Sequence, residues 1–225
     1  MGRVRLDLHV HSRYSPDSEL SLESIASGLA AVGLNGFALT DHNSVAGHSE
    51  LAALQTRFPG LILVPGVEVS TLEGHLLVYG VSEAPARGRP VAETVDWVRG
   101  HGGVSVLSHP FRRAHGVGRA VAESVRVDAI ETVNGHNSPG ANRKAAEVAA
   151  RRGLGVTGGS DVHALFDLGR AYAEFAEGTI GVDAVLRSIR EHTSTAGGRS
   201  LTLPGRVRYE WRTALLRLRR GFRPI

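Results

Sequence analysis

The chain has 225 residues, a mass of 23.9 kDa and a formal net charge of +4. Hydrophobic residues make up 42% of it, which excludes an intrinsically disordered chain. Cysteine is absent, so disulfides, thiolate metal sites and cysteine nucleophiles are excluded as well. Apolar runs stay well short of the ~20 residues of a membrane span and the first residues lack an apolar signal core, so we expect a soluble, cytoplasmic protein.

The predicted secondary structure alternates between strands and helices. Residues 4–10 alternate between apolar and polar side chains, which predicts a strand with Leu6, Leu8 and Val10 on one face. The next predicted elements are a helix over 22–32, a strand over 36–40, a helix over 44–57, a strand over 61–69 interrupted at Pro65 and Gly66, and a strand over 75–81. They are followed by a helix over 91–99, a strand over 103–108, a helix over 117–126, a strand over 128–133, a helix over 141–152, a strand over 154–157, an extended segment over 171–175 and a helix over 182–192.

This alternation of short strands with helices is typical of α/β proteins with a mostly parallel sheet. About seven such units predict a closed or nearly closed barrel, with an open, doubly wound sheet as the alternative. The positive charge lies outside these units: residues 199–225 carry eight arginines and one acid, a net +7, whereas residues 1–198 carry −3. We therefore predict one folded domain over 1–198 and a basic tail over 199–225.

The tail has an apolar stripe at helical spacing, which predicts an amphipathic helix packed on the barrel. The stripe consists of Val207, Trp211, Leu215 and Leu218. Two alternatives remain open for the tail arginines, namely binding to nucleic-acid phosphates and association with an anionic membrane surface.

Histidines and acidic residues gather near the ends of the predicted strands. The set comprises His9, His11, Asp17, His42, Glu68, His75, His109, Asp161 and His163. Because the C-terminal ends of parallel barrel strands open onto one face, we expect these side chains to converge. His75 precedes its strand, so it converges with the others only if that strand runs antiparallel or lies at the rim.

Imidazole and carboxylate ligands without sulfur suit zinc, manganese and iron. A single His-x-His pair is weak evidence for a metal, but nine such residues in this arrangement are not typical of a structural role. Since one catalytic ion takes about three or four protein ligands, the set predicts two or three divalent ions with a bridging carboxylate.

The order of the motifs resembles the polymerase and histidinol phosphatase (PHP) family of metal-dependent phosphoesterases over about residues 4–175. The motifs are DLHVHS at 7–12, TDHN at 40–43, GVEVS at 66–70, His75, SHP at 108–110 and GSDVH at 159–163. The resemblance implies a distorted (β/α)7 barrel. It also implies three groups of ligands: His9, His11, Glu68 and Asp161 for a first ion; Glu68, His75 and His109 for a second; and Asp17, His42 and His163 for a third.

The resemblance further implies phosphoester hydrolysis by a hydroxide held between the ions. We expect Glu68, Asp161, His163 and Arg112 as catalytic groups. Candidate substrate-binding residues follow other strands on the same face, with exposed loop positions as the alternative: Arg13, Arg112, Arg113, Asn134 and Arg170. Asp41 is expected to hold a ligand imidazole by a hydrogen bond. Asp7 either does the same or has a structural role at the start of its strand.

Nucleotides or nucleic-acid ends are the substrates we expect, with nucleic acid also able to contact the basic tail. Histidinol phosphate or another small phosphomonoester is the alternative substrate. A non-catalytic module that binds metal or nucleic acid on the same scaffold is the alternative from a different class. The sequence predicts no oligomeric state.

Overall fold

The computed structural model describes residues 3–200 and, in the tail, residues 205, 211, 215 and 218. Over 3–200 the strands are β1 Val4–Val10, β2 Gly36–Leu39, β3 Ile62–Ser70, β4 His75–Tyr79, β5 Val104–Leu107, β6 Ala129–Asn134, β7 Gly155–Gly159, β8 Ala171–Phe175 and β9 Thr195–Gly198. The helices are α1 Leu22–Leu29, α2 His48–Arg57, α3 Val91–Gly100, α4 Gly118–Ser124, α5 Pro139–Arg152 and α6 Gly181–Arg190. Short 3₁₀ segments span Ala30–Val32 and Leu165–Asp167.

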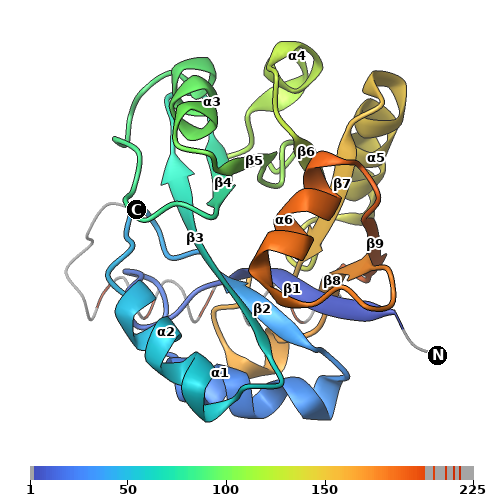
Figure 1. Cartoon of the computed structure of the whole chain (residues 1–225). Helices are drawn as coiled ribbons and strands as arrows, with labels where there is room; N and C mark the ends of the chain where they lie inside the picture. The colour runs from blue at the N-terminus through green and yellow to red at the C-terminus, as the bar shows by residue number, and fades with distance from the viewer. Residues whose placement is uncertain (1–2, 201–204, 206–210, 212–214, 216–217, 219–225) are drawn as a thin grey trace.

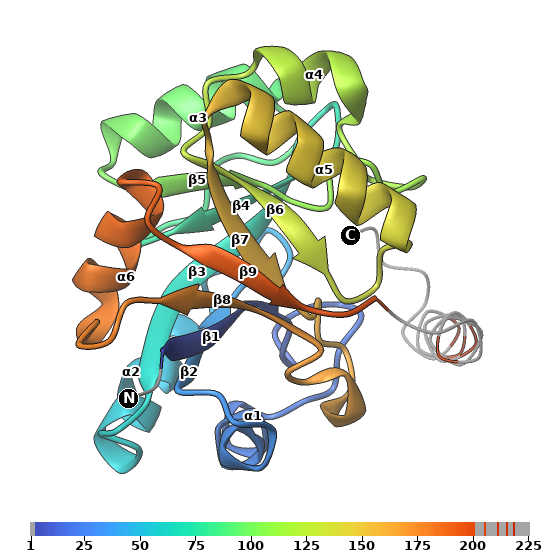
Figure 2. The same ribbon diagram turned by 90° about the vertical axis from the view of Figure 1, so that its right-hand side faces the viewer.

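The strands form one curved sheet in the order β7-β6-β5-β4-β3-β2-β1-β8-β9. The sheet nearly closes, because β7 also packs against β1, β8 and β9 (Figures 1 and 2). This confirms the predicted α/β barrel. The prediction of a mostly parallel sheet is wrong, since β4 runs antiparallel to β3 and β5, β8 to β1, and β9 to β8. The turn between β3 and β4 covers only residues 71–74, which is too short for a parallel crossover.

The reversed direction of β4 decides the position of His75. His75 pairs with Ser70 at the C-terminal end of β3, and Leu76 pairs with Leu107 at the end of β5. The first residue of β4 therefore lies at the edge where its neighbours end, and the antiparallel option for this strand is correct.

Three apolar clusters form the core. Residues of α1 and α2, such as Ile25 and Leu54, pack against β2 and β3, whereas α3, α4 and α5 cover β4 to β6. The two groups of helices lie at opposite sides of the molecule in Figure 1. Helix α6 packs against β3, β5 and β7. Val4, Ile62 and Gly181 line one surface pocket, so α6 begins beside the N-terminal ends of the strands.

The strand β1 differs from its predicted pattern. Leu6 and Leu8 belong to one core cluster and Val10 to another. The register of β1 against β2 shifts between Asp7 and Val10, and such a bulge breaks the simple alternation of faces.

Among the other elements, α2 begins four residues later than predicted, β3 continues through Pro65, and β9 was not predicted.

The tail is described at four positions, all helical. Trp211, Leu215 and Leu218 are 69%, 51% and 63% exposed, so the predicted packing on the barrel is not seen for these three. Val207 and most tail arginines lie outside the described residues, and the role of the tail stays a prediction. Within the described part of the chain, none of the helices has the length and apolar character needed to cross a bilayer.

Candidate metal centre

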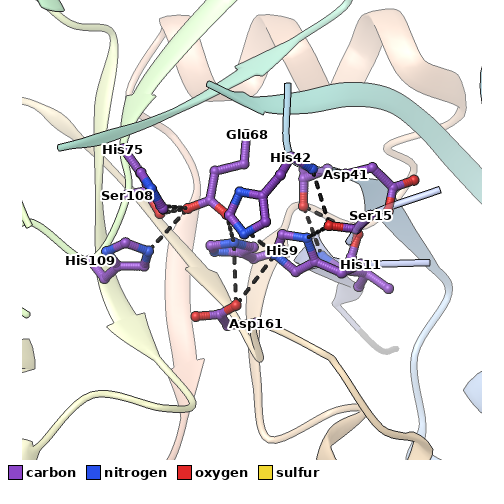
Figure 3. Close-up of polar contacts among 12 residues, drawn as sticks. His9, His11, Ser15, Asp41, His42, Glu68, His75, Ser108, His109 and Asp161 are labelled. Carbon is purple, nitrogen blue, oxygen red and sulfur yellow. Dashed lines mark hydrogen bonds and ion pairs between the residues drawn. The ribbon is translucent and has the colours of Figure 1, made fainter. Parts of the chain in front are cut away.

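All nine histidines and carboxylates predicted to bind metal lie together in the structure. They form four overlapping groups of possible ligands, and every member is buried. The groups are His11, Asp17, His42 and His163; His9, His11 and Asp161; His9, Glu68 and His109; and His42, Glu68 and His75. Within each group the ligand atoms lie within 4.8 Å of one another. The side chains come from the ends of strands and the loops after them, as Figure 3 shows for seven of the nine.

Glu68 lies at the middle of the cluster (Figure 3). Its Oε1 is 3.0 Å from both His75 Nδ1 and His109 Nε2. Its Oε2 faces the other side, 3.1 Å from His9 Nε2 and 3.3 Å from both His11 Nε2 and His42 Nδ1. One carboxylate thus separates two sets of imidazoles, which is the arrangement that a bridging ligand requires.

Two further carboxylates flank Glu68. Asp161 Oδ1 lies 3.5 Å from His9 Nε2 and 3.4 Å from His11 Nε2. Asp17 Oδ2 lies 2.9 Å from His163 Nε2 and 3.3 Å from His42 Nε2. Each carboxylate therefore faces a pair of imidazoles.

Several ring nitrogens in the cluster are close to oxygens without forming hydrogen bonds. They are His9 Nε2, His11 Nε2 and His42 Nδ1, and His109 Nδ1 is a further buried ring nitrogen without a hydrogen bond. His9 Nε2, for example, is 3.1 Å from Glu68 Oε2, but the two atoms are not aligned as donor and acceptor. Buried nitrogen and oxygen atoms that face a shared space fit divalent metal ions, which take both ligand types. The cluster therefore suits divalent metals.

Charges in the cluster are strongly coupled. Burial disfavours a charged imidazole at His9, but the carboxylates of Asp161, Glu68 and Glu131 outweigh it and hold its pKa well above the usual range. Burial also opposes charge on His11, yet the nearby carboxylates of Asp161 and Glu68 raise its pKa to about 10. Without metal, these imidazoles favour the protonated state.

The pKa values of the carboxylates shift in the opposite direction to those of His9 and His11. Burial would raise the pKa values of Glu68, Asp161 and Asp17, but the facing imidazoles hold all three well below the usual range. At His109, burial and the nearby Arg112 lower the pKa to about 3. The carboxylates and His109 are therefore already in the deprotonated state that metal binding requires.

Of the predicted substrate-binding residues, Arg112 and Asn134 lie at the cluster. Arg112 Nη2 lies 2.5 Å from Asp161 Oδ2 and donates to Asn134 Oδ1 at 2.7 Å, while its Nε donates to Asn137 Oδ1. The guanidinium is held in place and keeps a side-chain exposure of 22%. It is a fixed cation at the mouth of the metal centre.

The other three arginines predicted to bind substrate do not contact the nine clustered residues in the described structure. Arg13 pairs with Glu50 at 2.7 Å and is half-exposed. Arg170 pairs with Asp167, and Arg113 is exposed.

Asp41 and Asp7 differ from the expected imidazole-holding role. Asp41 accepts hydrogen bonds from the backbone and hydroxyl of Ser12, so it fixes the loop after His11 instead of holding an imidazole. Asp7 accepts backbone bonds from His9, Ser160 and Gly169, which ties β1 to the segment after β7. Burial raises the pKa of Asp7 to about 7. The structural alternative is thus the correct one for Asp7.

Several polar residues at the site were missed by sequence reasoning. Ser108 donates to Glu68, Ser15 donates to Asp17, and Glu131 lies beside His9. His136, in contrast, was expected on this face after the strand over 128–133, in substrate contact or as a loop residue; it is buried with its ring centre 6.0 Å from that of His163, and it faces Asp167 at 3.6 Å. The signal for Glu131 was a lone acid within the apolar strand at 129–134.

Together, a nearly closed α/β barrel and a buried histidine–carboxylate cluster at the strand ends define a metal-binding enzyme scaffold. Two family models match the sequence: PHP domain over residues 7–86 and PHP-associated (PHP_C) over residues 139–194. The chain therefore contains a PHP domain and a PHP-associated segment. The first match contains six of the nine clustered residues, from His9 to His75, and the second contains Asp161 and His163.

Curated relatives include two uncharacterised proteins of Methanocaldococcus jannaschii. One is 27% identical over 61% of this chain and 85% of its own length. The other is 28% identical over 77% of this chain and 71% of its own length. Both alignments include most of the barrel sequence, and neither protein's name states an activity.

Three solved structures share the fold. PsfC from Pseudomonas syringae superposes with a TM-score of 0.69 at 18% identity, covering 98% of this chain and 99% of its own. A candidate metal-dependent phosphoesterase from Bifidobacterium adolescentis gives 0.62 at 18% identity, covering 89% and 98%. An amidohydrolase from Chromobacterium violaceum, with bound sulfate, gives 0.63 at 22% identity, covering 83% and 96%. The family and the cluster together support a metal-dependent hydrolase.

Proposed function

We propose that this protein is a metal-dependent phosphoesterase. The observation that carries the proposal is Arg112, a fixed guanidinium beside Asp161 at the metal centre. A hydrolase for neutral amides has no need of a permanent cation there, whereas a phosphate ester offers oxygens that a guanidinium binds in a paired geometry.

We further propose that the nine clustered residues hold two or three divalent ions, of manganese, zinc or iron. Glu68 would contribute to two of the positions, because its two oxygens face different imidazoles. When bound, such ions make hydroxide available near neutral pH and offset the charge of the phosphate.

The protein residues have separate tasks in this proposal. Arg112 binds and orients the phosphate, while Asn134 and Asn137 hold its guanidinium. His163 serves as a ligand and not as a proton carrier, because its Nδ1 lies 2.7 Å from the Asp161 carbonyl oxygen and its Nε2 faces Asp17. Glu68 and Asp161 are kept ionised by the surrounding imidazoles.

Two of the structural neighbours are consistent with this chemistry. One is named as a candidate metal-dependent phosphoesterase, and another holds sulfate, which is a tetrahedral dianion like phosphate. Neither identifies the substrate of this protein. As substrates we propose nucleotides or nucleic-acid ends.

A substrate screen tests the proposal. The protein is loaded in turn with manganese, zinc and iron, and hydrolysis is measured for p-nitrophenyl phosphate, its bis ester, mononucleotides, nucleoside 3′,5′-bisphosphates, short RNA and DNA, histidinol phosphate and an amide substrate. Turnover of phosphate esters with a preference for nucleotides supports the proposal. Preference for histidinol phosphate would contradict nucleotides as the substrate class and favour a small phosphomonoester. Turnover of the amide alone would contradict phosphoester hydrolysis. Full metal loading without any turnover would indicate a non-catalytic binding module.

A further inference from the structure

A carboxylate outside the set of nine lies directly behind the metal centre. Glu131, on β6, is completely buried. Its Oε1 is 3.0 Å from His9 Nδ1, and its Oε2 accepts hydrogen bonds from the backbone N–H of His109 at 2.8 Å and from Asn134 Nδ2 at 3.0 Å. These contacts offset the cost of burying the carboxylate and connect three parts of the site.

Backbone irregularities accompany both ends of the Glu131–His9 contact. The register of β6 against β7 shifts between Glu131 and Val133, and that of β1 against β2 shifts between Asp7 and Val10. A bulge redirects a side chain relative to the regular alternation of a strand. The two shifted strands thus bring this acid and His9 together across the barrel.

The contact with Oε1 fixes how His9 presents its ring. A carboxylate can only accept a hydrogen bond, so it keeps a proton on His9 Nδ1. The opposite nitrogen, Nε2, then faces the cluster, 3.1 Å from Glu68 and 3.5 Å from Asp161. A carboxylate behind a ligand imidazole both orients the ring and increases its basicity.

For two other imidazoles of the cluster, the nearest partner of Nδ1 is a neutral oxygen, although Asp161 Oδ1 also lies 3.5 Å from His163 Nδ1. His163 Nδ1 contacts the Asp161 carbonyl oxygen at 2.7 Å, and His11 Nδ1 contacts the Ser15 hydroxyl at 3.4 Å. The carboxylate behind His9 is a stronger acceptor than either of these groups.

The contacts with Oε2 reach the other side of the centre. His109 has a φ of +29°, a backbone conformation that is costly for a non-glycine residue, and its N–H points to Glu131. Asn134, which donates to the same oxygen, also accepts the hydrogen bond from Arg112. The carboxylate is therefore linked to one candidate ligand by its ring, to a second by its backbone and to the phosphate-binding guanidinium through one amide.

We infer that Glu131 is the positioning residue of the metal centre, which sets the orientation of His9, the turn at His109 and the amide that holds Arg112. The inference rests on the metal centre of the proposed function. Substitution of this acid lowers metal affinity and changes the coordination geometry, although no ligand is removed.

Cobalt titration of the metal-free protein tests the inference, because the visible absorption of bound Co²⁺ reports ligand geometry. In Glu131→Gln, one end of the side chain becomes a donor, so it can no longer accept from His9 at one oxygen and from His109 and Asn134 at the other. We expect at least one cobalt ion to bind about 10- to 100-fold more weakly, with altered absorption bands.

The matched control is Asp128→Asn. Asp128 directly precedes β6, is partly buried and accepts two 2.8 Å hydrogen bonds from Ser105 at one oxygen, so the change removes the same charge from a neighbouring hydrogen-bonded carboxylate that does not contact the cluster. We expect this variant to bind cobalt like the original protein, and the thermal midpoints of the metal-free forms of both variants show whether each has folded.

Unchanged cobalt affinity and absorption in Glu131→Gln would overturn the inference, and so would equal losses in both variants. Absence of cobalt binding in the original protein would instead contradict the metal centre itself. If Glu131→Gln does not fold, Glu131→Asp keeps the charge but withdraws it by one methylene. The same weakened binding is then expected, and unaltered binding counts against the inference.

Discussion

Arg112 combines two properties that phosphate recognition needs, a permanent charge and a fixed direction. Its contacts with Asp161, Asn134 and Asn137 use acceptors from two parts of the chain, the end of β6 with the loop after it and the segment after β7. The adjacent Arg113 is exposed. These two consecutive arginines thus differ in their surroundings, so Arg113 is a suitable control for substitutions of Arg112.

Replacement of Arg112 by alanine is expected to lower kcat/KM for phosphate esters about 100-fold, because the guanidinium that binds the phosphate oxygens is lost. Arg112→Lys should recover only part of this, since an ammonium lacks the paired donors. Steady-state kinetics with Arg113→Ala as the matched control check this. Equal kinetics of the Arg112 and Arg113 variants would contradict the role of Arg112.

Metal binding is expected to depend steeply on pH. The raised pKa values of His9 and His11, about 10 for the latter, mean that a metal must displace protons at neutral pH. Affinity should therefore rise with pH, with net proton release. Before metal is added, stability from protonated His11 is fully present below about pH 6.5 and is lost as the pH rises through about 10.

Calorimetric titration in buffers of different ionisation enthalpy counts the protons released. Constant affinity between pH 6 and pH 9, with no proton release, would disprove the predicted coupling.

The sequence predicts the site residues at the ends of strands but not the one inside a strand. His9, His11, Asp161 and His163 were predictable because ligand residue types at alternate positions after apolar strands are distinctive. Glu131 was not, because a lone acid within a strand is equally consistent with a solvent-exposed position and the sequence does not show the bulge that follows it. The strand β9 escaped prediction because its sequence, Thr-Ala-Gly-Gly, has no apolar periodicity.

Close packing between β1 and β7 should be essential to the metal centre. A Cβ at Gly159 would lie 2.3 Å from His9 Cβ and 3.0 Å from Glu131 Oε1. Gly159→Ala is therefore expected to cost about 1–3 kcal/mol of stability and to weaken metal binding, because His9 must move. In contrast, Gly140→Ala in α5 has no neighbour within 4 Å and should stabilise by about 0.5–1 kcal/mol.

Thermal unfolding and metal titration of both glycine variants check this pair. Retention of full metal affinity in Gly159→Ala would show that the β1–β7 contact is not needed to position His9.

The distribution of charge over the chain separates the catalytic barrel from the tail. Residues 1–198 carry a net −3, which divalent ions in the centre would more than offset, and residues 199–225 carry +7. A phosphate ester would therefore be attracted by the metal centre, and the tail arginines could add attraction only for a longer polyanion.

Truncation after Ser200 tests the tail. This boundary keeps the bond from Arg199 N–H to Arg170 and the contact between Ser200 and Asn142, which join the end of the barrel sequence to the fold. Turnover of RNA or DNA should fall at low salt and approach that of the full chain at high salt, while mononucleotide turnover stays unchanged. An equal loss for mononucleotides would contradict a role of the tail in steering polynucleotides.

The most direct measurement combines metal content and phosphoester turnover in the original protein and in Glu68→Gln. Metal is removed by chelation, manganese, zinc or iron is restored, and bound metal and hydrolysis are followed in the same samples. Glu68 contacts five imidazoles, so we expect the original protein to regain two or three ions together with activity. The variant should bind fewer ions and lose about 100-fold or more in kcat/KM. A full metal complement and undiminished turnover in Glu68→Gln would contradict a metal-dependent phosphoesterase centred on this carboxylate.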